Sequence, residues 1–178
     1  YIGAAWGGLW KTEDGGLTHT LVNDDLPLSA VCGIAIDSDA PENIAVALSD
    51  IVWYGPSGVG VFVSDDGGET FTPTDIAWGL SDNVRIYYMD QDPNDPNTIL
   101  LATSDGLYKT TDFFETSTVT HDSHTRSVKY SHSTPGLVFV GDNGGRIYRS
   151  TDGGDSFTLL TDFGSGHVRI AVSLEAGS

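Results

Sequence analysis

Short stretches in which apolar and polar residues alternate recur along the chain, separated by turns rich in Gly, Pro, Asn and Asp. Three pairs of such stretches flank a turn, at 33–49, 86–104 and 127–143. Alternation combined with β-branched residues and Pro/Asn turns is typical of β-hairpins. No stretch shows a convincing apolar period of 3.6 residues, so we expect almost no helix.

A second pattern recurs four times, starting at Gly7, Gly60, Gly106 and Gly145. Each copy reads Gly, an alternating apolar stretch, Ser or Thr, any residue, Asp, a two-residue turn and a second stretch that opens with polar residues. The Ser/Thr anchors are Thr12, Ser64, Thr110 and Ser150, spaced by 52, 46 and 40 residues. A repeat of about 40–50 residues fits a four-stranded β-propeller blade.

With the strands of a blade named A to D, the chain opens in a strand B at 1–6 and ends in a strand A at 168–173. Residues 1–178 therefore form a single propeller domain or segment, with sixteen strands and four blades' worth of sequence. Two arrangements stay open. The last strand closes a four-bladed ring by joining the first blade, or the chain is a segment completed by further blades or by a second copy.

The repeated motif Ser/Thr-x-Asp-x-Gly-x-Ser/Thr-Trp/Phe resembles the Asp-box, or BNR repeat. This repeat occurs in sialidases, sortilin-type receptors, xyloglucan-active glycosidases and photosystem II assembly factors. The copies at Ser64–Phe71 and Ser150–Phe157 match throughout, whereas the copy at Thr12 has His19 in place of the aromatic residue. In the copy at Thr110, Phe114 replaces Gly and Ser117 replaces the aromatic residue. The turns at 38–43 and 92–97 look most like the sortilin and xyloglucanase branches.

This resemblance covers essentially the whole chain and implies an all-β fold of propeller blades, each of four antiparallel strands. It implies no single activity, because the relatives include hydrolases, receptors and assembly factors. In such turns an Asp carboxylate accepts backbone N–H groups, and Gly supplies a positive φ. We therefore assign structural roles to the anchors above and to Asp14, Gly16, Asp66, Gly68, Asp112, Asp152 and Gly154. Phe114 leaves open whether its turn moves the positive φ or opens.

Composition excludes some classes of partner. The chain has 8 basic and 25 acidic residues, a net charge of −17, which argues against nucleic acid. The longest clean apolar run, Ile44 to Leu48, is far too short to insert in a membrane. Such acidity suits an extracellular or cell-surface protein, where salt screens the repulsion. The single cysteine, Cys32, lies in an apolar run and is expected to be a buried, inert thiol.

Three arginines open predicted A strands: Arg85, Arg126 and Arg169. In propeller relatives the A strand is innermost, and ligands bind on the face of the B–C and D–A loops, opposite the C–D turns. The resemblance thus implies an anion site like the arginine triad of sialidases, because guanidinium pairs bidentately with carboxylate. The alternative is that each arginine pairs with one of the 25 acids.

Aromatic residues on loops offer a second candidate surface for a glycan or protein ligand. They are Trp53, Tyr54 and Trp78, and the alternative is that they pack beneath a long loop. Aromatic residues on strands, including Trp6 and Trp10, are expected in the core.

Catalysis finds little support. A sialidase site needs a Tyr–Glu pair and an acid, but four of the five glutamates fall in turns on the opposite face or beside the motif. A xyloglucanase-like site needs two facing carboxylates, and nothing singles out a pair among Asp50, Asp82, Asp122 and Asp162.

No cofactor is expected, although the acidic turns 37–43 and 90–97 leave calcium open beside the simpler hairpin interpretation. Three histidines, His121, His124 and His167, leave a metal site open beside ordinary solvated or turn-capping roles.

The sequence therefore predicts a non-catalytic extracellular recognition module that binds glycan or protein, within a larger secreted or surface protein. Two alternatives remain. One is a glycoside hydrolase, sialidase- or xyloglucanase-like, whose other catalytic residues lie outside this chain, and the other is a structural spacer.

Overall fold

The computed structural model describes residues 1–22, 26–50 and 57–173, which form four antiparallel sheets. The first sheet holds β1 (Ile2–Ala4), β2 (Gly8–Lys11) and β3 (Thr20–Val22). The second holds β4 (Val31–Ile36), β5 (Ile44–Leu48), β6 (Gly60–Ser64) and β7 (Thr72–Ala77). The third holds β8 (Ile86–Asp92), β9 (Asp95–Thr103), β10 (Leu107–Thr110) and β11 (Thr118–His121). The fourth holds β12 (Thr125–Tyr130), β13 (Val138–Asp142), β14 (Arg146–Ser150) and β15 (Thr158–Asp162).

Each sheet is a meander whose strands pair in chain order, as expected of a propeller blade. We call the sheets blades 1 to 4. The predicted hairpin of blade 2 is confirmed, because Ile34 pairs with Val46 and Ala35 with Ala45. The only helix in the described part of the chain is a single 3-10 turn at Leu80–Asp82, and no helix there is long and apolar enough to span a membrane.

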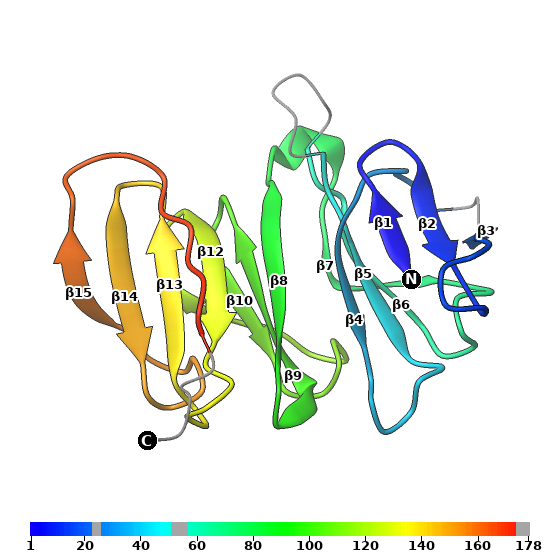
Figure 1. Ribbon diagram of the computed structural model, residues 1–178. Coiled ribbons are helices and arrows are strands. Elements are labelled where there is room, and N and C mark those ends of the chain that lie inside the picture. The colour runs from blue at the N-terminus through cyan, green and yellow to red at the C-terminus, as the bar shows by residue number, and fades with distance from the viewer. Residues whose placement is uncertain (23–25, 51–56, 174–178) are drawn as a thin grey trace.

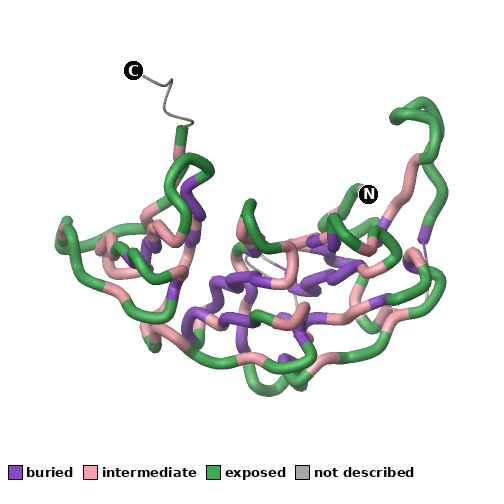
Figure 2. Tube along the Cα trace, turned by 90° about the horizontal axis from the view of Figure 1, so that it is seen from below, coloured by how far each residue is buried: buried purple, intermediate pink, exposed green. Residues whose placement is uncertain are grey.

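The blades stand side by side (Figure 1), and β4, β8 and β12 are the neighbouring inner strands. The A–B and C–D turns lie at one edge of the row, and the B–C and D–A connections lie at the other. Seen from below, the described chain follows an arc whose two ends lie apart (Figure 2). The described residues therefore form an open arc and not a closed four-bladed ring.

Buried apolar residues fill the spaces between successive blades. One cluster joins blades 2 and 3 through Ala47, Ile86 and Leu101, and another joins blades 3 and 4 through Leu100 and Val140. Strand β5 is buried at all five positions because it lies between β4 and β6 and is covered on both faces. The core thus lies between sheets, which fixes each inner strand relative to the next.

The predicted last strand is wrong, since residues 168–173 form no strand and belong to no sheet. A strand A needs strand B of its own blade as partner, and no strand among the described residues pairs with this segment. It lies beside β12 instead, where Ile170 N donates to Ser127 Oγ at 3.1 Å. Gly141 makes room for it, because a Cβ there would come within 2.8 Å of the Val168 side chain. The described chain therefore has fifteen strands.

Candidate functional site

The three inner strands each carry a β-bulge at the same position. The register shifts between Val31 and Gly33 in β4, between Ile86 and Tyr88 in β8, and between Thr125 and Ser127 in β12. The extra residues are Cys32, Tyr87 and Arg126. A bulge turns the side chain of its extra residue away from the regular up-and-down alternation of the strand. The side chains of Tyr87 and Arg126 can therefore meet between the neighbouring strands β8 and β12.

Arg126 lies over the ring of Tyr87, with its guanidinium carbon 4.2 Å from the ring centroid. Its Nε donates to Asn143 Oδ1 at 3.0 Å. A cation–π contact of this kind contributes about 0.5–2 kcal/mol and fixes the plane of the guanidinium. The Asn143 bond engages Nε, so the two terminal nitrogens remain the groups with which Arg126 can meet a ligand.

The segment after β15 brings a second guanidinium to this place. A cavity of about 130 Å³ is lined by Tyr87, Arg126, His167 and Arg169. A smaller hollow of about 110 Å³ adjoins it and shares Tyr87, Arg126 and Arg169. We call the four residues that line the larger cavity the inner cationic site. Two guanidinium groups beside a phenol are suited to hold a carboxylate through charge-assisted hydrogen bonds.

Two of the three predicted arginines therefore converge, and Arg85 does not line this cavity. The registers explain the difference. Arg85 lies two residues before the bulge of β8, so its counterpart in blade 4 is His124, not Arg126. Among the ion pairs of the described residues, none involves these three arginines. Within residues 1–22, 26–50 and 57–173, the alternative in which each arginine pairs with its own acid is not observed.

His124 lies against the inner cationic site. Its ring stacks on Tyr87 with centroids 5.3 Å apart, and its Nε2 lies 3.0 Å from Tyr87 Oη. Burial lowers the pKa of His124 below its usual value, the charges of Arg126 and His167 lower it further, and Asp142 acts in the opposite direction. His124 is therefore mainly neutral at pH 7, next to the permanent cation Arg126.

The predicted loop aromatics do not form a described surface. Trp53 and Tyr54 lie outside the described residues. Trp78 packs against the core of blades 2 and 3 and meets Tyr108 edge to face at 5.6 Å, which agrees with its packing interpretation.

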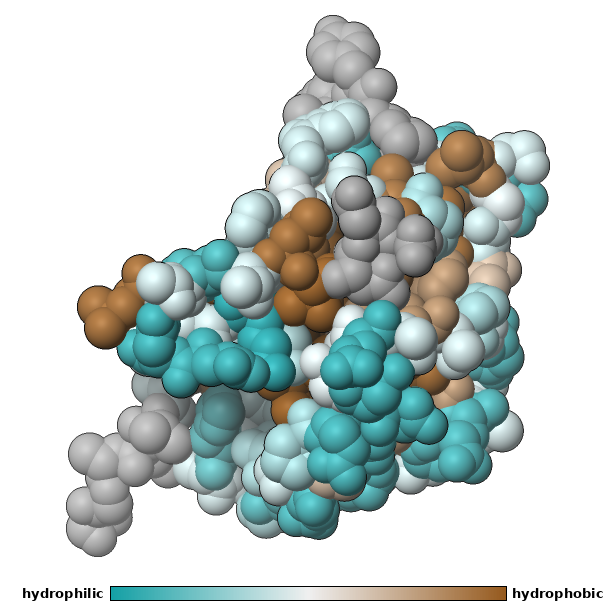
Figure 3. All heavy atoms as spheres, turned by 90° about the vertical axis from the view of Figure 1, so that its right-hand side faces the viewer, coloured by the Kyte–Doolittle hydropathy of each residue, from teal (hydrophilic) through white to brown (hydrophobic). Residues whose placement is uncertain are grey.

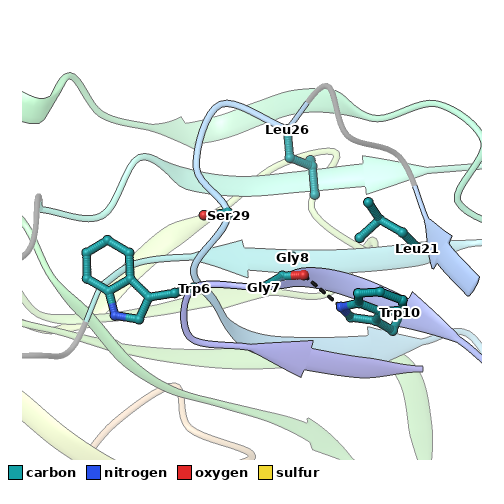
Figure 4. A pocket seen from close by; sticks show the side chains of 7 residues that line it. All are labelled: Trp6, Gly7, Gly8, Trp10, Leu21, Leu26 and Ser29. Carbon is teal, nitrogen blue, oxygen red and sulfur yellow. Dashed lines mark hydrogen bonds between the residues drawn. The ribbon is translucent and has the colours of Figure 1, made fainter. Parts of the chain in front are cut away.

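A second hollow, missed at the sequence level, lies in blade 1. Its volume is about 180 Å³, and it is lined by Trp6, Trp10, Leu21 and Leu26 among others. The expectation that Trp6 belongs to the core is wrong, because it sits in the β1–β2 turn and is 61% exposed. Trp10 Nε1 donates to Gly7 O at 2.7 Å, which ties this indole to the β1–β2 turn (Figure 4). Apolar side chains stand among hydrophilic ones on this side of the molecule (Figure 3).

The acidic C–D turns are held together by hydrogen bonds to their own aspartate side chains. Asp66 Oδ1 accepts from Ser64 Oγ and Thr70 N, and its Oδ2 accepts from Thr70 Oγ1 at 2.6 Å. Asp14, Asp112 and Asp152 repeat this arrangement. Hydrogen bonds from the hydroxyl and N–H of Thr70, and from Ser64, lower the pKa of Asp66 to about 2. These carboxylates are occupied in their own turns.

The turn at Thr110 keeps the same hydrogen bonds despite its altered sequence. Phe113 and Phe114 adopt φ of 55° and 70°, as the paired glycines do in the other three turns. The positive φ has therefore not moved and the turn has not opened. Phe114 is 3% exposed in the core between blades 2 and 3, so packing offsets the backbone strain.

No catalytic pair or metal cluster stands out among the described residues. Two of the candidate carboxylates cap turns: Asp82 Oδ2 accepts from Gly79 N, and Asp162 Oδ1 accepts from Gly164 N. No group of three His, Cys, Asp or Glu side chains in the described part is placed to hold a metal ion. In the turn at 90–97, Asp92 and Asp95 accept backbone N–H groups, as hairpin turns require.

Comparison with known proteins identifies the fold. No protein-family model and no curated protein matches the chain. Among solved structures, the chain is similar to an ancestral GH74 enzyme, with a TM-score of 0.72, 17% identity, and 92% of this chain covered but 22% of the other. It is similar to the GH74 xyloglucanase from Xanthomonas campestris, with a TM-score of 0.63 and 17% identity over 87% of this chain and 27% of the other. It is also similar to YCF48 bound to D1 peptide, with a TM-score of 0.55 and 16% identity over 77% of this chain and 42% of the other.

This chain has a β-propeller fold. It spans about a quarter of the length of the GH74 structures that it matches. At these identities the likeness establishes the fold alone, and the activities of those proteins are not transferred by it.

Proposed function

We propose that this chain is a non-catalytic recognition module that binds an acidic protein segment at the inner cationic site, within a secreted or cell-surface protein. The observation that carries the proposal is the convergence of Arg126 and Arg169 beside Tyr87 in one cavity. The cavity of about 130 Å³ has room for a carboxylate and the first carbons of its side chain, but not for a large ligand.

Charge supports this choice of ligand. On a chain of net charge −17, two guanidinium groups in one hollow form a local positive site that favours an anion over other ligands. Exposed ion pairs contribute only about 0–1 kcal/mol each, so the partly buried Arg126 and the Tyr87 face are needed for affinity. The similar YCF48 structure is bound to a peptide, which makes a peptide ligand reasonable for a propeller of this shape.

The test is binding of a fluorescein-labelled tetraglutamate peptide to the chain, followed by fluorescence anisotropy. R126Q combined with R169Q should weaken binding by roughly tenfold or more, since each change removes a charge-assisted hydrogen bond. R149Q is the matched control, because Arg149 is an exposed cation on β14 that does not line the cavity. A tetraglutamine peptide should not bind. Equal affinity of the double variant and R149Q would contradict the proposal.

A carbohydrate-directed function is the second candidate, including a glycoside hydrolase whose other catalytic residues lie outside this chain. The hollow beside the exposed Trp6 supports it, since aromatic faces suit sugar stacking. The likeness to GH74 propellers supports it too. It would be tested by binding and hydrolysis of xyloglucan oligosaccharides. Trp6→Ala should then reduce binding, and R126Q should leave it unchanged.

A further inference from the structure

We propose that His124 is a proton-responsive positioning residue of the inner cationic site, so that an anion binds together with a proton. This inference rests on the proposed function and deepens it, because it states how binding at that same site is regulated. It starts from a hydrogen bond between a residue of the site and a neighbouring histidine: His124 Nε2 and Tyr87 Oη lie 3.0 Å apart.

The geometry makes the direction of this bond depend on pH. A neutral imidazole can accept a hydrogen bond at Nε2, and the Tyr87 hydroxyl then donates its only proton to His124. A protonated imidazole can only donate from Nε2, so Tyr87 Oη becomes the acceptor. The hydroxyl proton of Tyr87 is then free to turn toward the cavity that this tyrosine lines. Protonation therefore adds one donor to the site as well as one positive charge.

The charges around His124 allow a bound ligand to change the protonation of its ring. The charged and titratable groups that face His124 are Arg126, His167 and Asp142, besides the Tyr87 hydroxyl. Two of the three charged neighbours are basic and disfavour a proton on His124 in the empty site. A carboxylate bound between Arg126 and Arg169 would offset their charge. Bound anion and bound proton then stabilise each other, and this coupling is reciprocal.

His124 is half-buried, and the pKa of its ring is lowered first by burial and then by the charges of Arg126 and His167, and a bound anion can offset those charges. Its proton is taken up below the usual range of histidine when the site is empty and at higher pH when the site is filled. The place of His124 in the blade also explains why a histidine, and not an arginine, suits a pH-dependent role at this position. His124 is the counterpart in blade 4 of Arg85, whose permanent charge could not respond to pH.

The experiment measures tetraglutamate affinity at pH 7.5 and pH 5.5 at constant ionic strength. The peptide carboxylates remain mainly ionised across this range. Affinity of the unmodified chain should rise roughly threefold to tenfold at pH 5.5, as expected for uptake of one proton. His124→Gln should lose the rise, so that its affinities at pH 7.5 and pH 5.5 are equal. Tyr87→Phe keeps the ring under Arg126 but lacks the hydroxyl, so it should lose part of the rise.

Two further variants separate this mechanism from simpler ones. His19→Gln, at an exposed position in blade 1, reports the general effect of a less negative chain and should retain the full rise. His167→Gln should also retain most of it. In a parallel titration, the ring carbon resonances of His124 should shift their midpoint to higher pH when peptide is added.

The outcomes distinguish this inference from the proposed function. Binding that needs Arg126 and Arg169 but is equally tight at both pH values overturns the role of His124 and leaves the proposed function standing. A rise that survives in His124→Gln, or that disappears in His167→Gln, also overturns it. Binding that is unaffected by the loss of both arginines overturns the two proposals together.

Discussion

Asp90 joins blade 3 to blade 4 and should be a main source of stability for the arc. Its Oδ1 accepts from Lys129 Nζ at 2.6 Å, and its Oδ2 accepts from Tyr130 N at 2.8 Å. The side chains of Asp90 and Lys129 are only 15% and 23% exposed. Burial opposes the charge of Lys129, but the hydrogen bond and charge of Asp90 outweigh it and raise the pKa of Lys129. Asp90→Ala would leave an ammonium group and a backbone N–H without their acceptor.

The magnitude follows from this partial burial. Breaking a fully buried ion pair costs about 3–5 kcal/mol, and losing a hydrogen bond to a charged group costs about 1.5–3 kcal/mol. Water reaches part of this pair and lowers the penalty, so we expect Asp90→Ala to reduce the free energy of unfolding by about 2–4 kcal/mol. Asp90→Asn retains an acceptor for Tyr130 N and should lose less, about 1–2 kcal/mol.

Urea unfolding at pH 7 measures this loss as a lower midpoint at unchanged slope. Glu13→Ala is the matched control, because Glu13 pairs with Lys11 at 2.9 Å but is 79% exposed. This control should show no measurable change. If Asp90→Ala unfolded at the same urea concentration as Glu13→Ala, the contact between blades 3 and 4 would not depend on this pair, and the reasoning from burial would be refuted.

Three further predictions concern other parts of the fold. Phe114→Gly relieves a positive φ but removes a core side chain, so it should lower the free energy of unfolding by roughly 1–4 kcal/mol in urea titrations; an increase would show that strain outweighs packing. Cys32 is half-buried and not fully buried as expected, and burial of its thiol raises the pKa to about 12, so iodoacetamide at pH 8 should label it much more slowly in the native chain than after unfolding, and equal rates would disprove this. Asp66 has its pKa lowered to about 2, so its stabilising effect is present above the unfolded value near 4 and is lost as pH falls toward 2. The melting temperature of Asp66→Asn should therefore fall less between pH 4.5 and 2.5 than that of the unmodified chain, and parallel losses would count against this role.

Much of the fold could be predicted from the sequence because its information is local. Alternation and turn residues specify each hairpin, and the repeated motif specifies how hairpins join into blades. The last strand was predicted wrongly, since 168–173 has the right pattern but pairs with no strand among the described residues. Pattern alone reports which residues can form a strand, whereas a ladder also needs a partner.

The candidate site was harder to predict because it depends on register. Arg85, Arg126 and Arg169 all open predicted A strands, but their alignment in the sequence slips by one or two residues, and the β-bulges place Tyr87 and not Arg85 opposite Arg126. A bulge changes the face on which every following side chain of the strand lies. No residue type in these strands indicates from the sequence that a bulge is present. Trp6 was misassigned for a related reason, because β1 ends at Ala4 and leaves this tryptophan in a turn.

The most direct test of the account is chemical-shift mapping of the isotope-labelled chain with unlabelled tetraglutamate. The account predicts that the largest changes occur at the Tyr87 ring and at the guanidinium groups of Arg126 and Arg169, with little change in the acidic turns around Asp14 and Asp66. Changes centred on Trp6 or on those turns, with the two guanidinium groups unaffected, would contradict it.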